Sequence, residues 1–198
     1  MKELLKDVEE AIIEIKSRLK LIDIDLKSNG FPSIEHIKTR IKTKDSIKNK
    51  MSKKGLSITP ENVQKNIRDL GGVRVTVLFI EDVYRIFKML EEQEDLEITR
   101  IKDYIKNPKK SGYQSLHLNI LVPIRKNKTI KKVEVELQIR TVGMDFFASV
   151  EHLLAYKKDN VDEDIHKRLF KCSEMVTNLD KELFEIYGIL SKEKKSLG

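Results

Sequence analysis

The segment Val133–Arg140 (V-E-V-E-L-Q-I-R) constrains the fold more strongly than any other stretch of the sequence. Its apolar residues alternate with four polar ones, Glu134, Glu136, Gln138 and Arg140. Because successive side chains of a strand point to opposite faces, this alternation predicts a half-buried strand with one apolar and one polar face. The chain must therefore build a β-sheet whose apolar side is covered.

The polar face of this strand has two interpretations. It is either the ordinary solvent-facing side of a sheet, which is the commoner case, or a catalytic surface. On a catalytic surface a carboxylate would hold a metal ion or accept a proton. The alternation alone does not choose between Glu134 and Glu136 as that carboxylate.

Around this segment, strands and helices alternate along the middle of the chain. Strands are predicted at 73–79, 97–102, 115–122 and 130–139, and helices at 81–92 and 142–157. The residues R-K-N-K at 125–128 predict a hairpin turn between the last two strands. This order predicts an α/β (α+β) fold, in which helices pack on a mixed sheet.

Long amphipathic helices are predicted at both ends of the chain. A stripe over 1–30 consists of Leu4, Val8, Ile12, Ile15, Leu19, Ile22 and Leu26. A strict 3.5-residue repeat over 162–191 consists of Ile165, Leu169, Cys172, Val176, Leu179, Leu183, Ile186 and Leu190. The repeat predicts a coiled-coil-like seam whose partner is the other helix, the sheet or a second copy of the chain. Cys172 is predicted to be a core residue of this seam.

The composition favours a single domain, 1–198, in the cytoplasm. Hydrophobic residues make up 39% of the 198 residues and charged residues 36%, which is enough apolar material for one core. No apolar run reaches the roughly 18 residues that a membrane-spanning helix requires. The first ten residues carry acids where a signal peptide would be apolar. The single cysteine excludes an intrachain disulfide.

The net charge of +7 is concentrated in the stretch 38–54, which holds eight basic residues and one acid. A helix is expected to begin there at Asp45 or Ser46, with Lys48 and Lys50 on its first turns. The free N–H groups of a helix start, together with these lysines, suit a triphosphate. The glycines of a Walker A loop are missing. The alternatives are a solvated face or an RNA-binding patch.

Asp69 precedes the first of the central strands and is followed by Gly71 and Gly72. A carboxylate at such a strand entrance can lie close to a bound phosphate and its magnesium ion. The alternative is a turn in which Asp69 bonds its own backbone. The sequence leaves both interpretations open.

The stretch 107–117 (N-P-K-K-S-G-Y-Q-S-L-H) combines basic residues, a glycine and an aromatic ring. Lys109 and Tyr113 would suit a phosphate and a stacked base; the alternative is a surface loop in which Tyr113 packs locally. His117 alone is more often a hydrogen-bonded polar side chain than a catalyst. The sequence lacks zinc-binding spacings and any local motif of a Ser-His-Asp hydrolase.

Taken together and in this order, these segments resemble the synthetase domain of the RelA/SpoT family. The matching motifs lie between Arg40 and Lys158 and are R-I-K-x-x-x-S-I-x-x-K, D-L-G-G-V-R, R-I-K-D-Y-I-x-x-P-K-x-x-G-Y-Q-S-L-H and E-L-Q-I-R-T-x-x-M-D-F-F-A-x-x-E-H. The chain is similar to the small alarmone synthetases of the RelQ/RelP type. The resemblance implies a nucleotidyltransferase-like mixed sheet of about five strands, with the catalytic core at 38–158.

The resemblance also implies the reaction, which is transfer of pyrophosphate from ATP to the 3′-hydroxyl of a guanosine nucleotide. The products are (p)ppGpp and AMP. Asp69 and Glu136 would hold Mg²⁺, and Glu136 would also help to deprotonate the attacking hydroxyl. Only the resemblance selects Glu136 over Glu134.

The remaining site residues follow from the same resemblance. Around ATP, Arg40 and Arg74 would sandwich the adenine, and the phosphates would meet Lys42, Ser46, Lys48 and Lys50. Around the acceptor, Tyr113 would stack on guanine beside Ala148, with Gln138 as a further contact. The acceptor phosphates would face Lys102, Lys109 and His117. GTP, GDP and GMP are all candidate acceptors.

Two departures from the family pattern stand out. Phe147 replaces the usual Trp, which we expect to affect packing, and the stretch 36–39 differs from the RelQ pattern. The resemblance implies a homotetramer and a product alarmone bound between subunits. Two competing hypotheses are an RNA-binding module that uses 38–54 and a scaffold built on the heptad helix; the scaffold leaves the carboxylate motifs unexplained.

Overall fold

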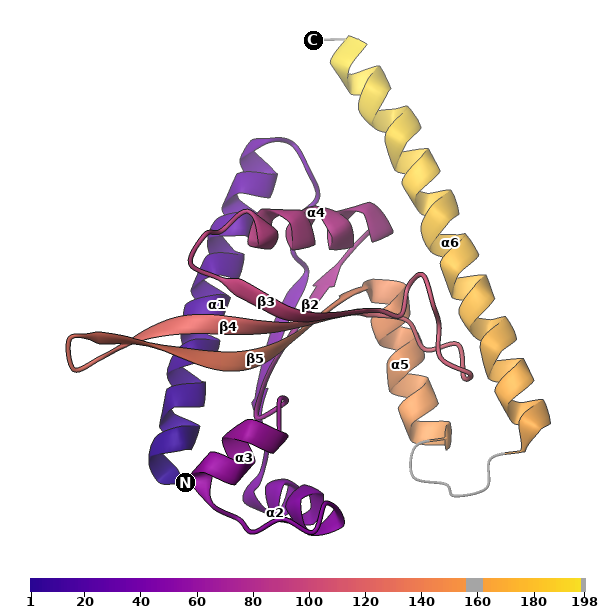
Figure 1. Cartoon of the computed structure of the whole chain (residues 1–198). Helices are drawn as coiled ribbons and strands as arrows, with labels where there is room; N and C mark the ends of the chain where they lie inside the picture. Colours follow the sequence, from indigo (N-terminus) through magenta and orange to yellow (C-terminus); the bar gives the residue numbers. More distant parts are fainter. Residues whose placement is uncertain (156–161, 197–198) are drawn as a thin grey trace.

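Five strands form the central sheet of the computed structural model, which describes residues 1–155 and 162–196 (Figure 1). In spatial order they are β1 (His36–Ile41), β2 (Gly71–Val77), β5 (Thr129–Thr141), β4 (Leu116–Lys126) and β3 (Glu97–Asp103). β2 and β5 run parallel, whereas the other three pairs are antiparallel. The predicted mixed sheet of about five strands is confirmed.

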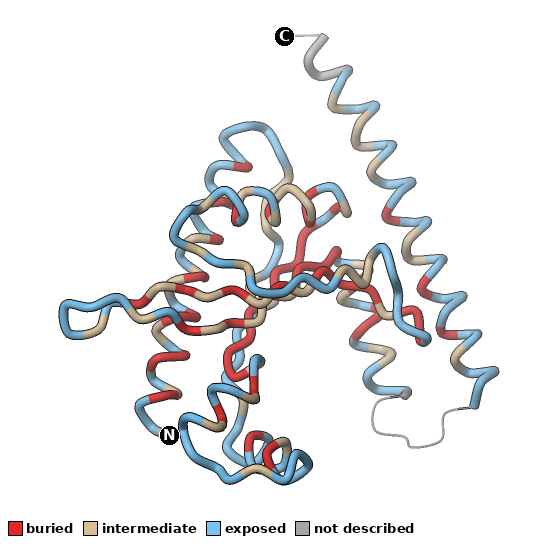
Figure 2. The backbone as a smooth tube through the Cα atoms, viewed as in Figure 1, coloured by how far each residue is buried: buried red, intermediate tan, exposed pale blue. Residues whose placement is uncertain are grey.

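Two helices cover the apolar face of the sheet: α1 (Lys2–Ser28) and α4 (Ile80–Glu91) (Figures 1 and 2). All seven residues of the predicted N-terminal stripe are buried in one core with the inward-facing residues of the strands. Burial of each such aliphatic side chain stabilises the fold by about 1.5–3 kcal/mol. At Gly71 the helix comes very close, since a Cβ there would lie 2.7 Å from Cγ1 of Val8. The polar face of β5 is therefore turned away from the core.

The strand β1 is missing from the four strands predicted from the sequence. It is an edge strand whose residues are almost all exposed, so no alternation of apolar and polar residues marks it. The helix α3 (Pro60–Asn66) was also not predicted. Its start does carry a recognisable signal, because the Thr59 hydroxyl accepts a hydrogen bond from the Asn62 N–H and Pro60 opens the first turn.

The helix α2 (Lys44–Lys53) begins close to the predicted position. Its N-cap is Thr43, whose hydroxyl accepts a hydrogen bond from the backbone N–H of Ser46 at 3.2 Å. The predicted hairpin between β4 and β5 is also present. Its turn places Asn127 and Lys128 at positive φ, 45° and 68°.

The helices α5 (Val142–Ala155) and α6 (Glu163–Ser196) complete the structure. The predicted helix end at Lys157 and core end at 158 lie outside the described residues. The predicted C-terminal seam is only partly buried in a single chain: Leu169 is buried, whereas Leu179, Leu183, Ile186 and Leu190 are exposed. The prediction that Cys172 is a core residue is wrong, because the next residue, Ser173, faces inward instead. Among the described helices, none is long and apolar enough to cross a bilayer.

Candidate active site

Two rows of side chains cross the polar face of the sheet, because the strand registers place them side by side. One row consists of Arg40, Gly72, Glu136, Asn119 and Arg100. The next consists of Lys38, Arg74, Gln138, His117 and Lys102. Residues paired in register share a face, so these positions form one continuous surface. Glu136 and Gln138 occupy its middle, on the central strand.

Glu136 is held by two neighbours. Its Oε2 accepts a hydrogen bond from Nε2 of Gln138 at 2.9 Å, and its Oε1 lies 3.6 Å from Nδ1 of His117. Burial is the largest influence and favours the neutral acid, but the contacts with His117 and Gln138 outweigh it, so the pKa of Glu136 is lowered. The carboxylate is therefore ionised at neutral pH and can accept a proton or hold a cation.

His117 lies beside Glu136, with only 13% of its side chain exposed. Its Nε2 is 2.9 Å from the hydroxyl oxygen of Tyr113. Nη2 of Arg140 donates a hydrogen bond to the same oxygen at 2.6 Å, because an arginine side chain can only donate. The Tyr113 hydroxyl therefore donates its own hydrogen to Nε2 of His117. The proton of the neutral imidazole is then on Nδ1, the nitrogen that faces Glu136. Burial lowers the pKa of His117, so this neutral tautomer is the form present near pH 7.

Arg140 closes a ring of contacts, because its Nη2 also donates to Oε1 of Gln138 at 2.8 Å. Its side chain is only 4% exposed, and its charge is balanced by Asp145, 3.2 Å away. The same Asp145 oxygen lies 3.1 Å from Nη1 of Arg74. One carboxylate thus bridges two arginines, and both Arg140 and Asp145 were absent from the predicted site residues. A buried arginine at the end of the polar stripe of β5 was the available signal.

Asp69 lies between two lysines. Oδ2 is 2.6 Å from Nζ of Lys42, and Oδ1 is 2.8 Å from Nζ of Lys50. Burial would raise the pKa of Asp69, yet the two ammonium groups lower it to about 2. The basic run thus contacts Asp69 through Lys42 and Lys50, a pairing that the sequence did not predict. Asp69 therefore forms two ion pairs and not the alternative, a turn in which its side chain bonds its own backbone.

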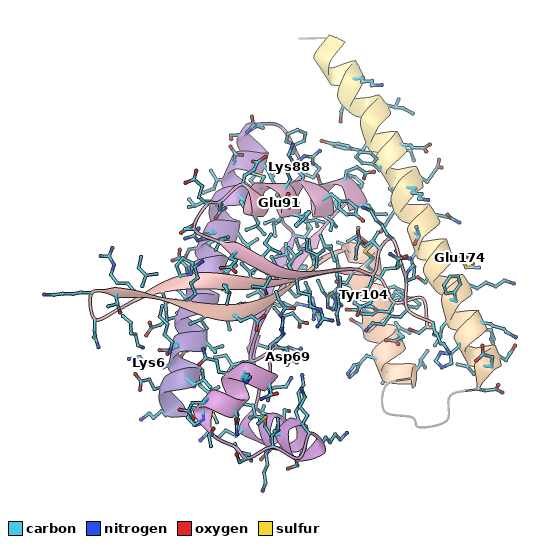
Figure 3. All side chains as sticks on the ribbon, viewed as in Figure 1. Lys6, Asp69, Lys88, Glu91, Tyr104 and Glu174 are labelled. Atoms are coloured by element: carbon cyan, nitrogen blue, oxygen red, sulfur yellow. The ribbon has the colours of Figure 1, made fainter. Side chains whose placement is uncertain are left out.

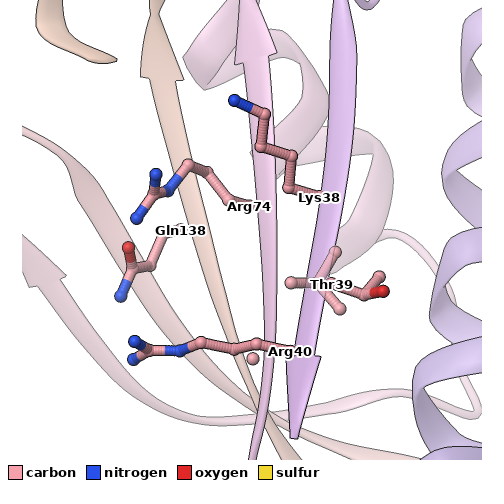
Figure 4. Close-up of a pocket in the computed structure, with 7 residues that line it drawn as sticks. Lys38, Thr39, Arg40, Arg74 and Gln138 are labelled. Atoms are coloured by element: carbon pink, nitrogen blue, oxygen red, sulfur yellow. The ribbon is translucent and has the colours of Figure 1, made fainter. Parts of the chain in front are cut away.

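A small cavity of about 150 Å³ opens between β1 and β2 (Figure 4). Arg40 and Arg74 extend from the strands on either side of it, with Gln138 between their guanidinium groups. Gly72 forms its floor, and a Cβ there would come within 3.2 Å of Nε of Arg40. The glycine lets the Arg40 side chain lie flat along the sheet. Two guanidinium groups that line one cavity suit a stacked aromatic base.

A wide cavity of about 630 Å³ adjoins the small one and shares Arg40, Arg74 and Gln138 with it. The other residues that line it come from the 107–117 loop, the strands and α5: Lys109, Tyr113, His117, Arg140, Ala148, Ser149, Glu151 and His152. Nζ of Lys109 lies over the Tyr113 ring, 4.4 Å from its centroid. The structure thus brings together the predicted acceptor residues of the loop, β5 and α5.

A basic cavity of about 350 Å³ lies on the other side of Glu136. It is lined by six basic residues, two acids and two asparagines: Lys50, Lys54, Lys65, Arg68, Arg100, Lys102, Asp69, Glu136, Asn66 and Asn119. Of the basic residues only Lys50 and Lys102 were predicted. Lys65 and Arg68 escaped prediction because no motif marks them; the fold of α3 brings them there. Such an excess of cations suits phosphate groups.

Three predicted phosphate contacts line none of these cavities: Lys42, which pairs with Asp69, and two residues of α2. Ser46 and Lys48 are exposed on α2, and neither lines any of the three cavities described above. The hydroxyl of Ser46 is bonded to Thr43 at 2.9 Å. By contrast, the predicted packing role of Phe147 agrees with its burial in α5.

The residues present fit a magnesium ion that is shared with a substrate. Within 1–155 and 162–196, no group of three or more His, Cys, Asp and Glu side chains forms a metal site. Asp69 and Glu136 nevertheless line one cavity, and the negative charge of Asp69 acts to raise the pKa of Glu136. Magnesium commonly takes one or two carboxylates from the protein and its remaining ligands from phosphates and water. Figure 3 shows Asp69 beside α3, and it is one of the residues that line this cavity.

Comparison with known proteins gives a consistent result. The family described as the region found in RelA/SpoT proteins matches residues 39–161. GTP pyrophosphokinase YwaC of Bacillus subtilis (strain 168) is 41% identical over 159 residues, which are 80% of this chain and 76% of that protein. The solved structure of small alarmone synthetase 1 from Bacillus subtilis bound to its product pppGpp is 33% identical, with a TM-score of 0.81. The structure of the same synthetase bound to AMPCPP is 30% identical, with a TM-score of 0.73. Each covers 96% of this chain and 97% of its own.

Proposed function

Since the chain belongs to the RelA/SpoT family, we propose that it is a GTP pyrophosphokinase that transfers pyrophosphate from ATP to the 3′-hydroxyl of GDP or GTP, giving (p)ppGpp and AMP. The observation that carries the proposal is the position of Glu136, an ionised carboxylate that lines the basic cavity and contacts Gln138 and His117, which line the wide cavity. The test is incubation of the purified protein with ATP, Mg²⁺ and each of GTP, GDP and GMP. Release of AMP with a pyrophosphorylated guanosine nucleotide supports it; ATP hydrolysis alone would refute it.

On the ATP side, the adenine would stack between Arg40 and Arg74 in the small cavity. The polyphosphate would then extend over Asp69 towards the basic cavity. Lys42 and Lys50 now neutralise Asp69, and they can turn to phosphate oxygens when ATP arrives. This exchange would leave both oxygens of Asp69 free. Magnesium, held by Asp69 and Glu136, would neutralise part of the charge on the phosphates.

On the acceptor side, guanine would stack on Tyr113 beside Ala148 in the wide cavity. The acceptor phosphates would lie near the basic residues Lys102 and Lys109. Glu136 would take the proton of the 3′-hydroxyl while the hydroxyl oxygen attacks the β-phosphorus of ATP. The bond between the β-phosphorus and the oxygen that bridges to the α-phosphate breaks at the same time. AMP then leaves with that oxygen. His117 would contribute by linking the two sides of the site, through its hydrogen bond with Tyr113 and its contact with Glu136 at 3.6 Å.

The floor of the small cavity gives a prediction for ATP binding. Gly72→Val would place branched carbons against the Arg40 side chain, which already lies within 3.2 Å of a Cβ built at this position. We expect the KM for ATP to rise about 10-fold, the equivalent of losing one good stacking contact, and the KM for the acceptor to rise less, since Arg40 lines the wide cavity only at the edge that it shares with the small one. Steady-state kinetics with each substrate varied in turn would check this. Equal rises in both KM values would contradict the assignment of Arg40 to ATP.

The ring of Tyr113 gives a matching prediction for the acceptor. Stacking of a base on an aromatic side chain contributes about 1–3 kcal/mol, so Tyr113→Ala should raise the acceptor KM roughly 10- to 100-fold. Tyr113→Phe keeps the ring but removes the hydroxyl that joins Arg140 to His117. It should therefore retain acceptor affinity and lower kcat instead. An acceptor KM that is unchanged in Tyr113→Ala would rule out stacking on this ring.

We also propose that copies of the chain associate, as the resemblance to small alarmone synthetases implies for a tetramer. The support is the apolar edge of α6, where Leu179, Leu183, Ile186 and Leu190 are about half exposed in a single chain. Leucine and isoleucine at heptad spacing usually pack against another helix. These residues lie on a different side of α6 from Ser173 and Asp180, which face the rest of the chain.

A further inference from the structure

The inner face of α6 carries three polar side chains, Ser173, Thr177 and Asp180, which we call the α6 polar stripe. Their spacing of four and three residues places them on one side of the helix. Ser173 and Asp180 are buried, at 4% and 7% exposure. Figure 1 shows α6 lying alongside α5 and the loop between β3 and β4. The helix lies beyond residue 161, where the region shared with the RelA/SpoT family ends.

The first part of the stripe binds the loop that carries Tyr113. The Ser173 hydroxyl donates to the carbonyl oxygen of Gly112 at 2.5 Å and accepts from Nε2 of Gln114 at 3.3 Å. The Thr177 hydroxyl accepts from the same Nε2 at 2.9 Å and donates to the Ser173 carbonyl at 3.1 Å. Each hydroxyl therefore both donates and accepts, which fixes the orientation of the Gln114 amide.

The loop lies directly against the helix at Gly112. The φ angle of Gly112 is +86°, a backbone conformation that residues with a Cβ rarely adopt. A Cβ at this position would also lie 2.6 Å from Cβ of Ser173. Gly112 and Gln114 are the two chain neighbours of Tyr113. The backbone is thus anchored to α6 on both sides of the ring that faces the wide cavity.

The last residue of the stripe binds the start of α5. The Thr141 hydroxyl donates to Oδ2 of Asp180 at 2.5 Å and accepts from the backbone N–H of Met144 at 3.0 Å. Asp180 thereby orients the hydroxyl that caps α5. Close packing supports this contact, since a Cβ on Gly143 would lie 2.7 Å from Cγ1 of Val176. The helix that carries Ala148 is consequently fixed by the same face of α6.

We propose that the α6 polar stripe is a positioning element of the acceptor site, and that Ser173 and Thr177 set the place of the Tyr113 ring through Gly112 and Gln114. The inference rests on the proposed function, in which Tyr113 receives the acceptor base. Arg40 and Gly72 of the small cavity are on β1 and β2, away from these contacts. Loss of the Thr177 hydroxyl should therefore weaken acceptor binding selectively.

The test compares Thr177→Val, which keeps the shape but lacks the hydroxyl, with Thr177→Ser, which keeps the hydroxyl. Glu174→Ala is the matched control, because Glu174 is exposed on the same helix (Figure 3). We expect Thr177→Val to raise the KM for GDP about 10-fold, with the KM for ATP within about twofold of wild type. Thr177→Ser and Glu174→Ala should both stay within about twofold for either substrate. If Thr177→Val does not fold, Ser173→Ala provides the same comparison.

A second measurement does not depend on activity. Hydrogen exchange of the backbone amides of Lys109 and Gly112, which bond within the loop, should be faster in Thr177→Val than in Thr177→Ser. Wild-type protein that makes no pyrophosphorylated product would refute the proposed function but leave this result standing. Active wild type together with an unchanged acceptor KM in Thr177→Val, or with equal rises for both substrates, would overturn the inference.

Discussion

Glu136→Gln should reduce kcat by at least about 100-fold while the protein remains folded, because the substitution keeps the size of the side chain and removes its ability to accept a proton. The amide oxygen can still accept a hydrogen from one of the two donors that face Glu136, Gln138 or His117, but the amide NH2 group then faces the other donor, so one contact of the ring is lost. The loss should appear mainly in kcat, since the substrates are bound by other residues. Single-turnover release of AMP, with ATP and acceptor both saturating, would measure the chemical step directly.

Glu134→Gln is the matched control for this substitution. Glu134 lies two residues earlier on the same face of β5, and its side chain is about as buried as that of Glu136, at 21% and 19% exposure. It is bonded to Thr99 at 3.2 Å and lies 3.7 Å from Arg68. We expect activity within about threefold of wild type. Comparable losses of activity in both variants would show that the reaction depends on the negative charge of the polar face of β5 and not on Glu136 in particular.

Asp69→Asn should have the second largest effect, with a fall in kcat of roughly 100-fold and a higher requirement for Mg²⁺. The substitution removes one of the two carboxylates proposed to hold the metal. It also leaves Lys42 and Lys50 facing an amide, so the two lysines repel one another without compensation. A magnesium titration at saturating nucleotides would separate weaker metal binding from a slower chemical step.

The same substitution has a consequence for stability that depends on pH. The pKa of Asp69 is about 2 in the folded protein, below its ordinary value of 3.8, so its ion pairs stabilise the fold above pH 3.8. This contribution is lost as the pH falls from 3.8 towards 2. Allowing for partial solvent screening, we expect Asp69→Asn to lower the free energy of unfolding by roughly 1–2 kcal/mol at pH 7.

Chemical denaturation of Asp69→Asn and wild type at several pH values would reveal this difference. The two should converge as the solution becomes more acidic. Asp45→Asn serves as the control, because Asp45 is an exposed acid in the first turn of α2. Its effect should be a few tenths of a kcal/mol. A pH-independent deficit in Asp69→Asn would show that the ion pairs do not have the stability assigned to them.

The sequence predicted the parts of this structure in which burial follows a regular period. The stripe of α1 and the alternation of β5 both correspond to observed faces, because one side is buried along α1 and along 133–139 of β5. It did not predict β1, an edge strand without such a buried face. Edge strands pair through their backbones, and side-chain patterns do not record that pairing.

The candidate site was predictable where a motif names its residues and unpredictable where only the fold brings them together. Lys50 belongs to the basic run and Asp69 to a separate motif, and the fold joins them in an ion pair that the sequence did not predict. Lys65 and Arg68 belong to no motif and enter the basic cavity because α3 leads into β2. Cys172 was assigned to the core since a heptad pattern cannot tell which side of a helix faces its own chain.

The parallel pairing of β2 with β5 affects how the protein must fold. These strands are joined by α4, β3 and β4, so their pairing is among the long-range contacts of the chain and forms only after a large loop has closed. Both rows of the polar face run across this pair. A partly folded chain that lacks it has no complete nucleotide site, so nucleotides bind the native state alone and shift the folding equilibrium towards it. The rise in melting temperature on addition of a nucleotide should therefore depend on assembly of the β2–β5 pair as well as on the affinity for that nucleotide.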